Sequence, residues 1–168
     1  SSLSPAEEGR IELDRQPTDL AQVAGRVVAR LLPQAEDAGI ELSAQSSGAV
    51  PVLVDSDRIG QVVTNLVGNA IRATPAGGSI TVRTAVGESW AELTVTDTGE
   101  GIAAEDLARI FERFYRVPGR RRTGNDGGSG IGLTIARHLA EQHGGTVTAA
   151  SPGPGRGSSF TLRLPLTG

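Results

Sequence analysis

Apolar residues recur every three or four positions between residues 55 and 73, and this is the most regular pattern in the chain. Such spacing puts apolar side chains on one face of a helix, and Asp55 or Ser56 stands where a helix N-cap is expected. The sequence therefore predicts an amphipathic helix whose apolar stripe is formed by Ile59, Val62, Val63, Leu66, Val67, Ala70 and Ile71.

Two segments, residues 79–86 and 90–97, alternate apolar and polar side chains, which is typical of half-buried strands, and we expect them to pair antiparallel. Another helix is predicted after Thr18 or Asp19, and Gly39 ends it. Shorter strands are predicted at residues 11–13, 40–45, 50–54, 146–151 and 158–166, and further helices at residues 103–117 and 132–145. This order predicts an α+β fold in which helices cover one face of a mainly antiparallel sheet.

Composition narrows the class of protein. With 168 residues, 38% of them apolar and 21% charged, the chain can form one domain with a substantial core. A formal net charge of -3 gives no basic surface field, which disfavours nucleic-acid binding as the main task. Cysteine is absent, which excludes disulfides and cysteine-ligated zinc. No apolar run approaches the roughly 18 to 20 residues that span a bilayer.

Three polar residues, Asn65, Asn69 and Arg72, form a stripe along one edge of the apolar face of the helix at residues 55–73. Asparagine is a poor helix former because its amide competes for backbone hydrogen bonds, so two of them in mid-helix need a reason. They are either polar residues at the boundary of the core or oxygen ligands for Mg²⁺, which keeps its bonds to substrate phosphates.

A carboxylate ends the strand at residues 90–97. Period two places Asp97 on the apolar side of this strand, where an unpartnered charge would cost several kcal/mol. Asp97 should therefore accept hydrogen bonds from something in a pocket, and Gly99 and Gly101 would let a flat ligand approach the turn. The alternative is an Asp-Thr-Gly turn whose side chain lies in solvent.

Two further features stand before the last predicted helix. Three aromatic residues lie within one turn, Phe111, Phe114 and Tyr115, and they either pack into the core, anchor a lid or contact another protein. Five glycines within residues 124–132 then lead into a helix, and bare backbone beside a helix start suits a phosphate group. No Gly-Lys-Ser/Thr closes this run, so it is not a P-loop.

Taken in order, these segments closely resemble the ATP-binding catalytic domain of bacterial two-component sensor histidine kinases, which have the Bergerat fold of the gyrase and histidine-kinase ATPase superfamily. "QVVTNLVGNAIRATPAGGSITV" is similar to the N box, "DTGEGI" to the G1 box, "FERFYR" to the F box and "GGSGIGLTIA" to the G2 box. The resemblance implies a two-layer α/β sandwich over residues 10–166, with residues 1–9 as a linker and an ATP lid at about residues 116–130.

The resemblance also assigns roles to residues. Asp97 is expected to hold the adenine amino group, and Asn69 to ligate a Mg²⁺ ion that bridges the ATP phosphates, with Asn65 supporting it one turn earlier. Arg72 and Arg116 are expected to act on the phosphates. The other residues expected at the nucleotide are Gly99, Gly101, Ile102, Phe111, Phe114, Tyr115, Gly128, Ser129, Gly130, Ile131, Gly132 and Leu133.

By the same resemblance, the reaction transfers the γ-phosphoryl group of ATP to a histidine on a separate dimerisation and phosphoacceptor domain, which serves a response regulator. The chain is expected to be a cytoplasmic domain of an inner-membrane sensor protein and not itself to contact the membrane. Structural roles are expected for His138 and His143. The alternatives are a superfamily ATPase, a protein-serine kinase, and a non-enzymatic interaction module that has the fold but binds no nucleotide. Asn65 favours the kinase, because gyrase-like relatives carry there a glutamate that activates water, and an amide is no general base.

Overall fold

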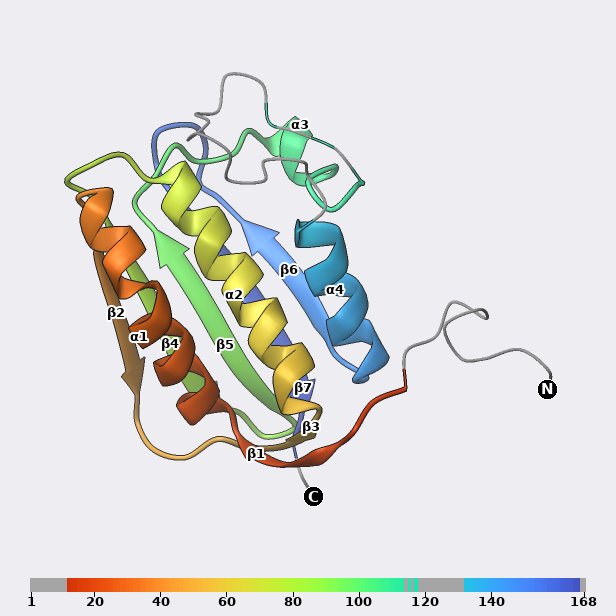
Figure 1. Ribbon diagram of the computed structural model, residues 1–168. Helices are drawn as coiled ribbons and strands as arrows, with labels where there is room; N and C mark the ends of the chain where they lie inside the picture. The colour runs from red at the N-terminus through yellow and green to blue at the C-terminus, as the bar shows by residue number, and fades with distance from the viewer. Residues whose placement is uncertain (1–11, 114, 116, 118–131, 167–168) are drawn as a thin grey trace.

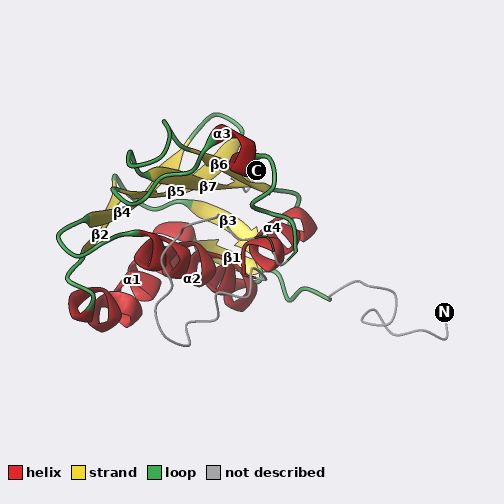
Figure 2. Ribbon diagram, turned by 90° about the horizontal axis from the view of Figure 1, so that it is seen from above, coloured by secondary structure: helices red, strands yellow, loops and turns green. Residues whose placement is uncertain are grey.

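The structure, a computed structural model, describes residues 12–113, 115, 117 and 132–166. Its helices and strands form two layers, a sheet and a set of helices packed on one face of that sheet (Figures 1 and 2). The strands are β1 (Gln16–Asp19), β2 (Glu41–Ser46), β3 (Pro51–Val54), β4 (Ser79–Val86), β5 (Trp90–Asp97), β6 (Thr146–Ala150) and β7 (Ser158–Pro165). The helices are α1 (Leu20–Asp37), α2 (Ser56–Ala73), α3 (Ala104–Leu107) and α4 (Gly132–Gln142).

The main sheet has five strands in the order β2-β4-β5-β7-β6. Strands β2 and β4 run parallel, whereas the other neighbours pair antiparallel. Strands β1 and β3 form a separate antiparallel pair. Helices α1, α2 and α4 lie side by side below the five-stranded sheet in Figure 2. The predicted α+β fold, with helices on one face of a mainly antiparallel sheet, is confirmed.

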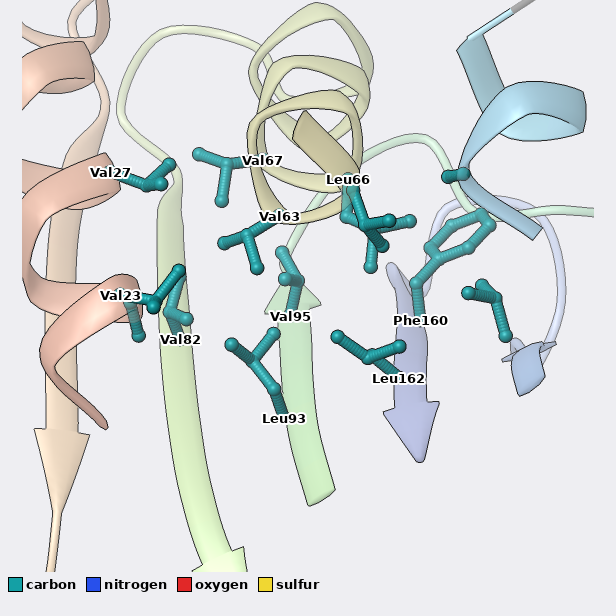
Figure 3. Packing of buried hydrophobic residues seen from close by; sticks show 14 of the residues in the cluster. Val23, Val27, Val63, Leu66, Val67, Val82, Leu93, Val95, Phe160 and Leu162 are labelled. Carbon is teal, nitrogen blue, oxygen red and sulfur yellow. The ribbon is translucent and has the colours of Figure 1, made fainter. Parts of the chain in front are cut away.

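Helix α2 forms where the apolar periodicity predicts it. Its N-cap is Asp55, whose side chain accepts a hydrogen bond from the backbone N–H of Arg58. Its apolar stripe faces the sheet, and Figure 3 shows the side chains of this helix pointing toward those of β4, β5 and β7. Burying each such valine or leucine contributes roughly 1.5–3 kcal/mol. The packed residues labelled there are Val23, Val27, Val63, Leu66, Val67, Val82, Leu93, Val95, Phe160 and Leu162.

Two predicted elements differ from the structure. The strand at residues 11–13 is wrong, since Glu12 and Leu13 have irregular backbone and β1 lies at Gln16–Asp19 instead. That strand has no apolar alternation, and it exists because β3 supplies its hydrogen-bond partners. The helix at residues 103–117 is confirmed only as α3, because the following N–H groups bond to carbonyls three residues back, as Glu112 does to Arg109, and so form turns.

Candidate functional site

The carboxylate of Asp97 is buried at the end of β5, with 3% of the residue exposed. Its Oδ1 accepts hydrogen bonds from the backbone N–H of Gly99 at 2.8 Å and of Ser158 at 3.2 Å. Its Oδ2 accepts one from the Ser158 hydroxyl at 2.9 Å. The alternative in which this side chain lies in solvent is therefore wrong. A carboxylate offers about four lone-pair positions, so three internal bonds leave one acceptor position, on Oδ2.

Ser158 is the residue that the sequence analysis missed. It stands directly opposite Asp97 in the pairing of β5 with β7, and it supplies both an N–H and a hydroxyl to the carboxylate. The two residues are 61 positions apart, and no local pattern fixes the register of strands so distant. The sequence predicted that Asp97 needed hydrogen-bond donors, and the chain itself provides three of them.

The turn after Asp97 is held between two backbone segments. A Cβ on Gly99 would lie 2.3 Å from the carbonyl oxygen of Ala73 at the end of α2. Gly101 has a φ of +72°, and a Cβ there would lie 2.1 Å from the carbonyl oxygen of Gly153. Both glycines are thus required by the close approach of the chain to itself. Gly99 thereby brings the turn after Asp97 against the last turn of α2, and Gly101 brings it against the connection between β6 and β7.

Asn65 and Asn69 lie one turn apart on α2 and have different surroundings. The Nδ2 group of Asn65 donates to the carbonyl oxygen of Gly132, the first residue of α4, at 3.0 Å. Asn69 is 7% exposed, and its Nδ2 atom is buried with no hydrogen-bond partner in the described part of the chain. A buried amide without an acceptor costs about 1–3 kcal/mol, so this orphaned donor needs a reason.

The two aromatic residues described before α4, Phe111 and Tyr115, make different contacts. Phe111 packs edge-on against Phe160 of the core, with ring centroids 6.3 Å apart. Its carbonyl oxygen accepts a hydrogen bond from the Thr134 hydroxyl at 2.9 Å, which ties this segment to α4. The hydroxyl of Tyr115 donates to the carboxylate of Asp106, and this hydrogen bond raises the pKa of Tyr115. The packing interpretation is confirmed for Phe111.

The structure brings only some of the predicted residues together. Arg72 is half-buried on the last turns of α2, Ile102 is buried in the core, and Leu133 is half-buried at the start of α4. Among the described residues, no group of three or more His, Cys, Asp or Glu side chains could hold a metal ion. The predicted positions that lie outside the described residues are Phe114, Arg116, Gly128, Ser129, Gly130 and Ile131, with nearly all of the lid.

Comparison with known proteins shows the family to which this chain belongs. The family model described as histidine kinase-, DNA gyrase B- and HSP90-like ATPase matches residues 54–168, more than half of the chain. The chain belongs to this family. It is an ATP-binding domain of the histidine kinase-like ATPases, and the predicted resemblance is confirmed. In the described part of the chain, no helix is long and apolar enough to cross a membrane.

Sensor kinases are prominent among the proteins similar to this ATPase domain. The sensor-like histidine kinase SenX3 of Mycobacterium tuberculosis is 38% identical over 88% of this chain and 35% of its own length. The mycobacterial sensor histidine kinase MprB has a solved structure with a TM-score of 0.79 and 31% identity, covering 90% of this chain and 98% of that one. Full-length ShkA in complex with AMPPNP has a TM-score of 0.82 and 30% identity, covering 97% of this chain and 34% of that one. The chain thus spans about a third of the length of SenX3.

Proposed function

We propose that this ATPase domain binds Mg-ATP and donates its γ-phosphoryl group to a histidine of a dimerisation and phosphoacceptor domain in a two-component sensor kinase. The similarity to SenX3 and MprB supports this proposal, since both are named as histidine kinases. The observation that carries it is the buried carboxylate of Asp97, which is held by three internal hydrogen bonds and keeps one acceptor position.

The adenine ring fits the acceptor left on Asp97. Adenine carries an exocyclic amino group, which donates hydrogen bonds, and a carboxylate is an acceptor only. Because Gly99 and Ser158 already hold this carboxylate in place, the nucleotide meets an acceptor whose orientation is set before binding. ShkA, with 30% identity, was solved in complex with the adenine nucleotide AMPPNP.

The phosphates fit the orphaned amide on α2. The Nδ2 group of Asn69 needs an acceptor, and phosphate oxygens are strong acceptors. The other atom of this amide, Oδ1, is the kind of ligand that Mg²⁺ takes, and Mg²⁺ binds through one or two protein oxygens together with substrate phosphates. When bound, the ion neutralises charge on the phosphates. Arg72, one turn further along α2, adds a positive charge on the same helix.

Asn65 favours transfer to another protein over hydrolysis. Its side-chain N–H is engaged with Gly132, and a neutral amide cannot take a proton from water. In the proposed reaction, the unprotonated ring nitrogen of the histidine forms the new bond to the γ-phosphorus, the bond from phosphorus to its bridging oxygen breaks, and ADP leaves. The cationic ring then loses the proton of its other nitrogen to solvent. Such transfer depends mainly on positioning and on charge neutralisation, with little covalent help from the protein.

The phosphoacceptor, the response regulator and any sensor or membrane segment belong to this proposal as well, since the relatives are longer than the chain. The experiment mixes the 168-residue chain with a separately expressed phosphoacceptor helix pair and ATP labelled at the γ-phosphate. We expect an acid-labile phosphohistidine on the helix pair, lost with Asn69→Asp or Asp97→Asn. Release of inorganic phosphate with no labelled protein would identify an ATPase instead, and an acid-stable product would identify a serine kinase.

A further inference from the structure

His143 lies at the C-terminal end of α4, and both of its ring nitrogens are engaged. Nδ1 donates a hydrogen bond to the carbonyl oxygen of Leu139 at 2.7 Å. Nε2 accepts a hydrogen bond from the backbone N–H of Asp55 at 3.1 Å. The residue is 3% exposed. Because Nε2 must accept, the imidazole is neutral with its proton on Nδ1. One ring therefore joins the end of α4 to the N-cap of α2.

The segment that leads into the domain is attached at the same place. The backbone N–H of Asp14 donates to Oδ2 of Asp55 at 3.1 Å, and the guanidinium of Arg15 donates to the carbonyl oxygen of Gln142 at 3.0 Å. Strand β1, which follows at once, pairs with β3 just before Asp55. The chain therefore reaches the domain at the junction of α2 with α4, at the far end from Asp97.

The opposite end of the same helix pair forms the candidate nucleotide site. Asn65 of α2 contacts Gly132 at the start of α4, and Asn69 follows one turn later. Helices α2 and α4 lie next to each other along their length in Figure 1. Side-chain hydrogen bonds thus link the two helices at two places, from Asn65 in the middle of α2 to the start of α4, and from the start of α2 to His143 just after α4.

We propose that His143 is a positioning residue for the nucleotide site, and that its bond to Asp55 sets the orientation of α4 against α2. This inference rests on the proposed function, and it extends that function to regulation. A displacement of the segment at Asp14 and Arg15 acts on Asp55 and on the end of α4.

Two conservative variants separate the bonds of His143. A glutamine places its terminal oxygen where Nε2 lies, so His143→Gln keeps an acceptor for Asp55 and loses the donor to Leu139. An asparagine places its amide where Nδ1 lies, so His143→Asn does the reverse. If the link between the helices matters, His143→Gln behaves like the wild type. His143→Asn and His143→Leu then both show the effects of losing the bond to Asp55. This difference from His143→Gln should remain even if all three variants lose similar stability.

The first measurement is hydrogen exchange in the nucleotide-free chain, comparing amides of α4 with amides of β5 in the same sample. For His143→Asn and His143→Leu, we expect exchange in α4 to be faster relative to β5 by roughly fivefold or more, the low end of typical coupling between sites. His143→Gln should restore the wild-type ratio. Leu42→Ala, a buried change on edge strand β2, serves as the control for general destabilisation and should leave the ratio unchanged.

The second measurement is the affinity for ATP with Mg²⁺ at pH 8, where we expect the same order of variants and a loss of roughly fivefold or more for His143→Asn. The proposal would be overturned if His143→Gln and His143→Asn had the same ratio of exchange in α4 to exchange in β5. This comparison tests the proposal even if His143→Leu fails to fold. Absence of ATP binding by the wild type would reject the proposed function, whereas the exchange ratios would still decide the role of His143.

Discussion

Asn65 and Gly132, which are 67 positions apart, are joined by a hydrogen bond of 3.0 Å from the Asn65 side chain to the Gly132 carbonyl oxygen. This bond fastens the start of α4 to the middle of α2, one turn from Asn69. The two asparagines of the helix therefore have separate tasks. Asn65 holds the chain together, and the amide of Asn69 stays available to a ligand.

Replacing Asn65 by alanine should weaken this fastening. We expect the free energy of unfolding to fall by about 1 kcal/mol, the usual contribution of one hydrogen bond. Urea unfolding of Asn65→Ala, compared with the wild type, measures the change. Gln61→Ala, an exposed position on the same helix, is the matched control and should change stability little. Equal stability of Asn65→Ala and the wild type would show that the bond contributes nothing.

Asn69 and Thr84 form a matched pair, because each has a buried polar atom without a partner in the described residues. Thr84 lies on β4 opposite Leu93, away from Asp97, which pairs with Ile80. Thr84→Val should raise stability and leave nucleotide affinity unchanged. Asn69→Ala should weaken binding of Mg-ATP by roughly tenfold or more, since a bond to a charged group is worth about 1.5–3 kcal/mol. Calorimetric titration decides, and comparable affinity of both variants would refute the ligand role of Asn69.

Gly99 and Gly25 should respond oppositely to alanine. A Cβ on Gly99 meets the Ala73 carbonyl at 2.3 Å, whereas one on Gly25, in α1, meets nothing within 4 Å. We expect Gly99→Ala to lower the free energy of unfolding by more than about 3 kcal/mol, in the range of severe core and backbone defects. Gly25→Ala should raise it by about 0.5–1 kcal/mol through helix propensity. A Gly99→Ala protein as stable as the wild type would mean that the turn is not clamped.

His143 should make the domain sensitive to acid. Burial lowers its pKa, the nearby Arg15 lowers it further, and the Leu139 carbonyl and Asp55 oppose this shift. Well above pH 6.5, His143 is neutral in both the folded and the unfolded chain, and its contribution is fully present. As pH falls below 6.5, the unfolded chain takes up a proton that the folded chain resists, so stability declines until the lower folded-state pKa is passed.

The measurement is urea unfolding between pH 5 and 8 for the wild type and His143→Gln. The variant should lose part of the decline toward low pH. His138→Gln, which alters an exposed histidine of α4, is the control and should retain it. Identical pH profiles for the wild type and His143→Gln would show that His143 does not contribute to the acid sensitivity.

The sequence predicted the elements correctly where a regular apolar spacing coincides with a large buried face. The stripe of α2 gave that helix with its N-cap Asp55, and period two along β5 placed Asp97 on the buried face. It failed for β1, whose residues Gln16–Asp19 have no apolar alternation and form a strand only because β3 is there to pair. It also overextended α3, because the residues after Leu107 form turns, from which Phe111 and Tyr115 make contacts that no local pattern encodes.

The candidate site was predictable as residue types and less so as contacts. A buried carboxylate on β5 required donors, but only the register of β5 with β7 reveals that Ser158 is one of them. The stripe of Asn65 and Asn69 was visible in the sequence, yet their different surroundings depend on where α4 begins. The magnesium role of Asn69 and the phosphate roles of Arg72 and Arg116 stay predictions.

The most direct test compares calorimetric titrations of the wild-type chain with ATP and with inosine triphosphate, each with Mg²⁺. Inosine carries a carbonyl oxygen where adenine has its amino group, so it would present an acceptor to the Asp97 carboxylate. Loss of this bond, together with repulsion of two acceptors, should weaken binding of inosine triphosphate by about tenfold or more. Equal affinity for the two nucleotides would contradict the claim that Asp97 reads the purine.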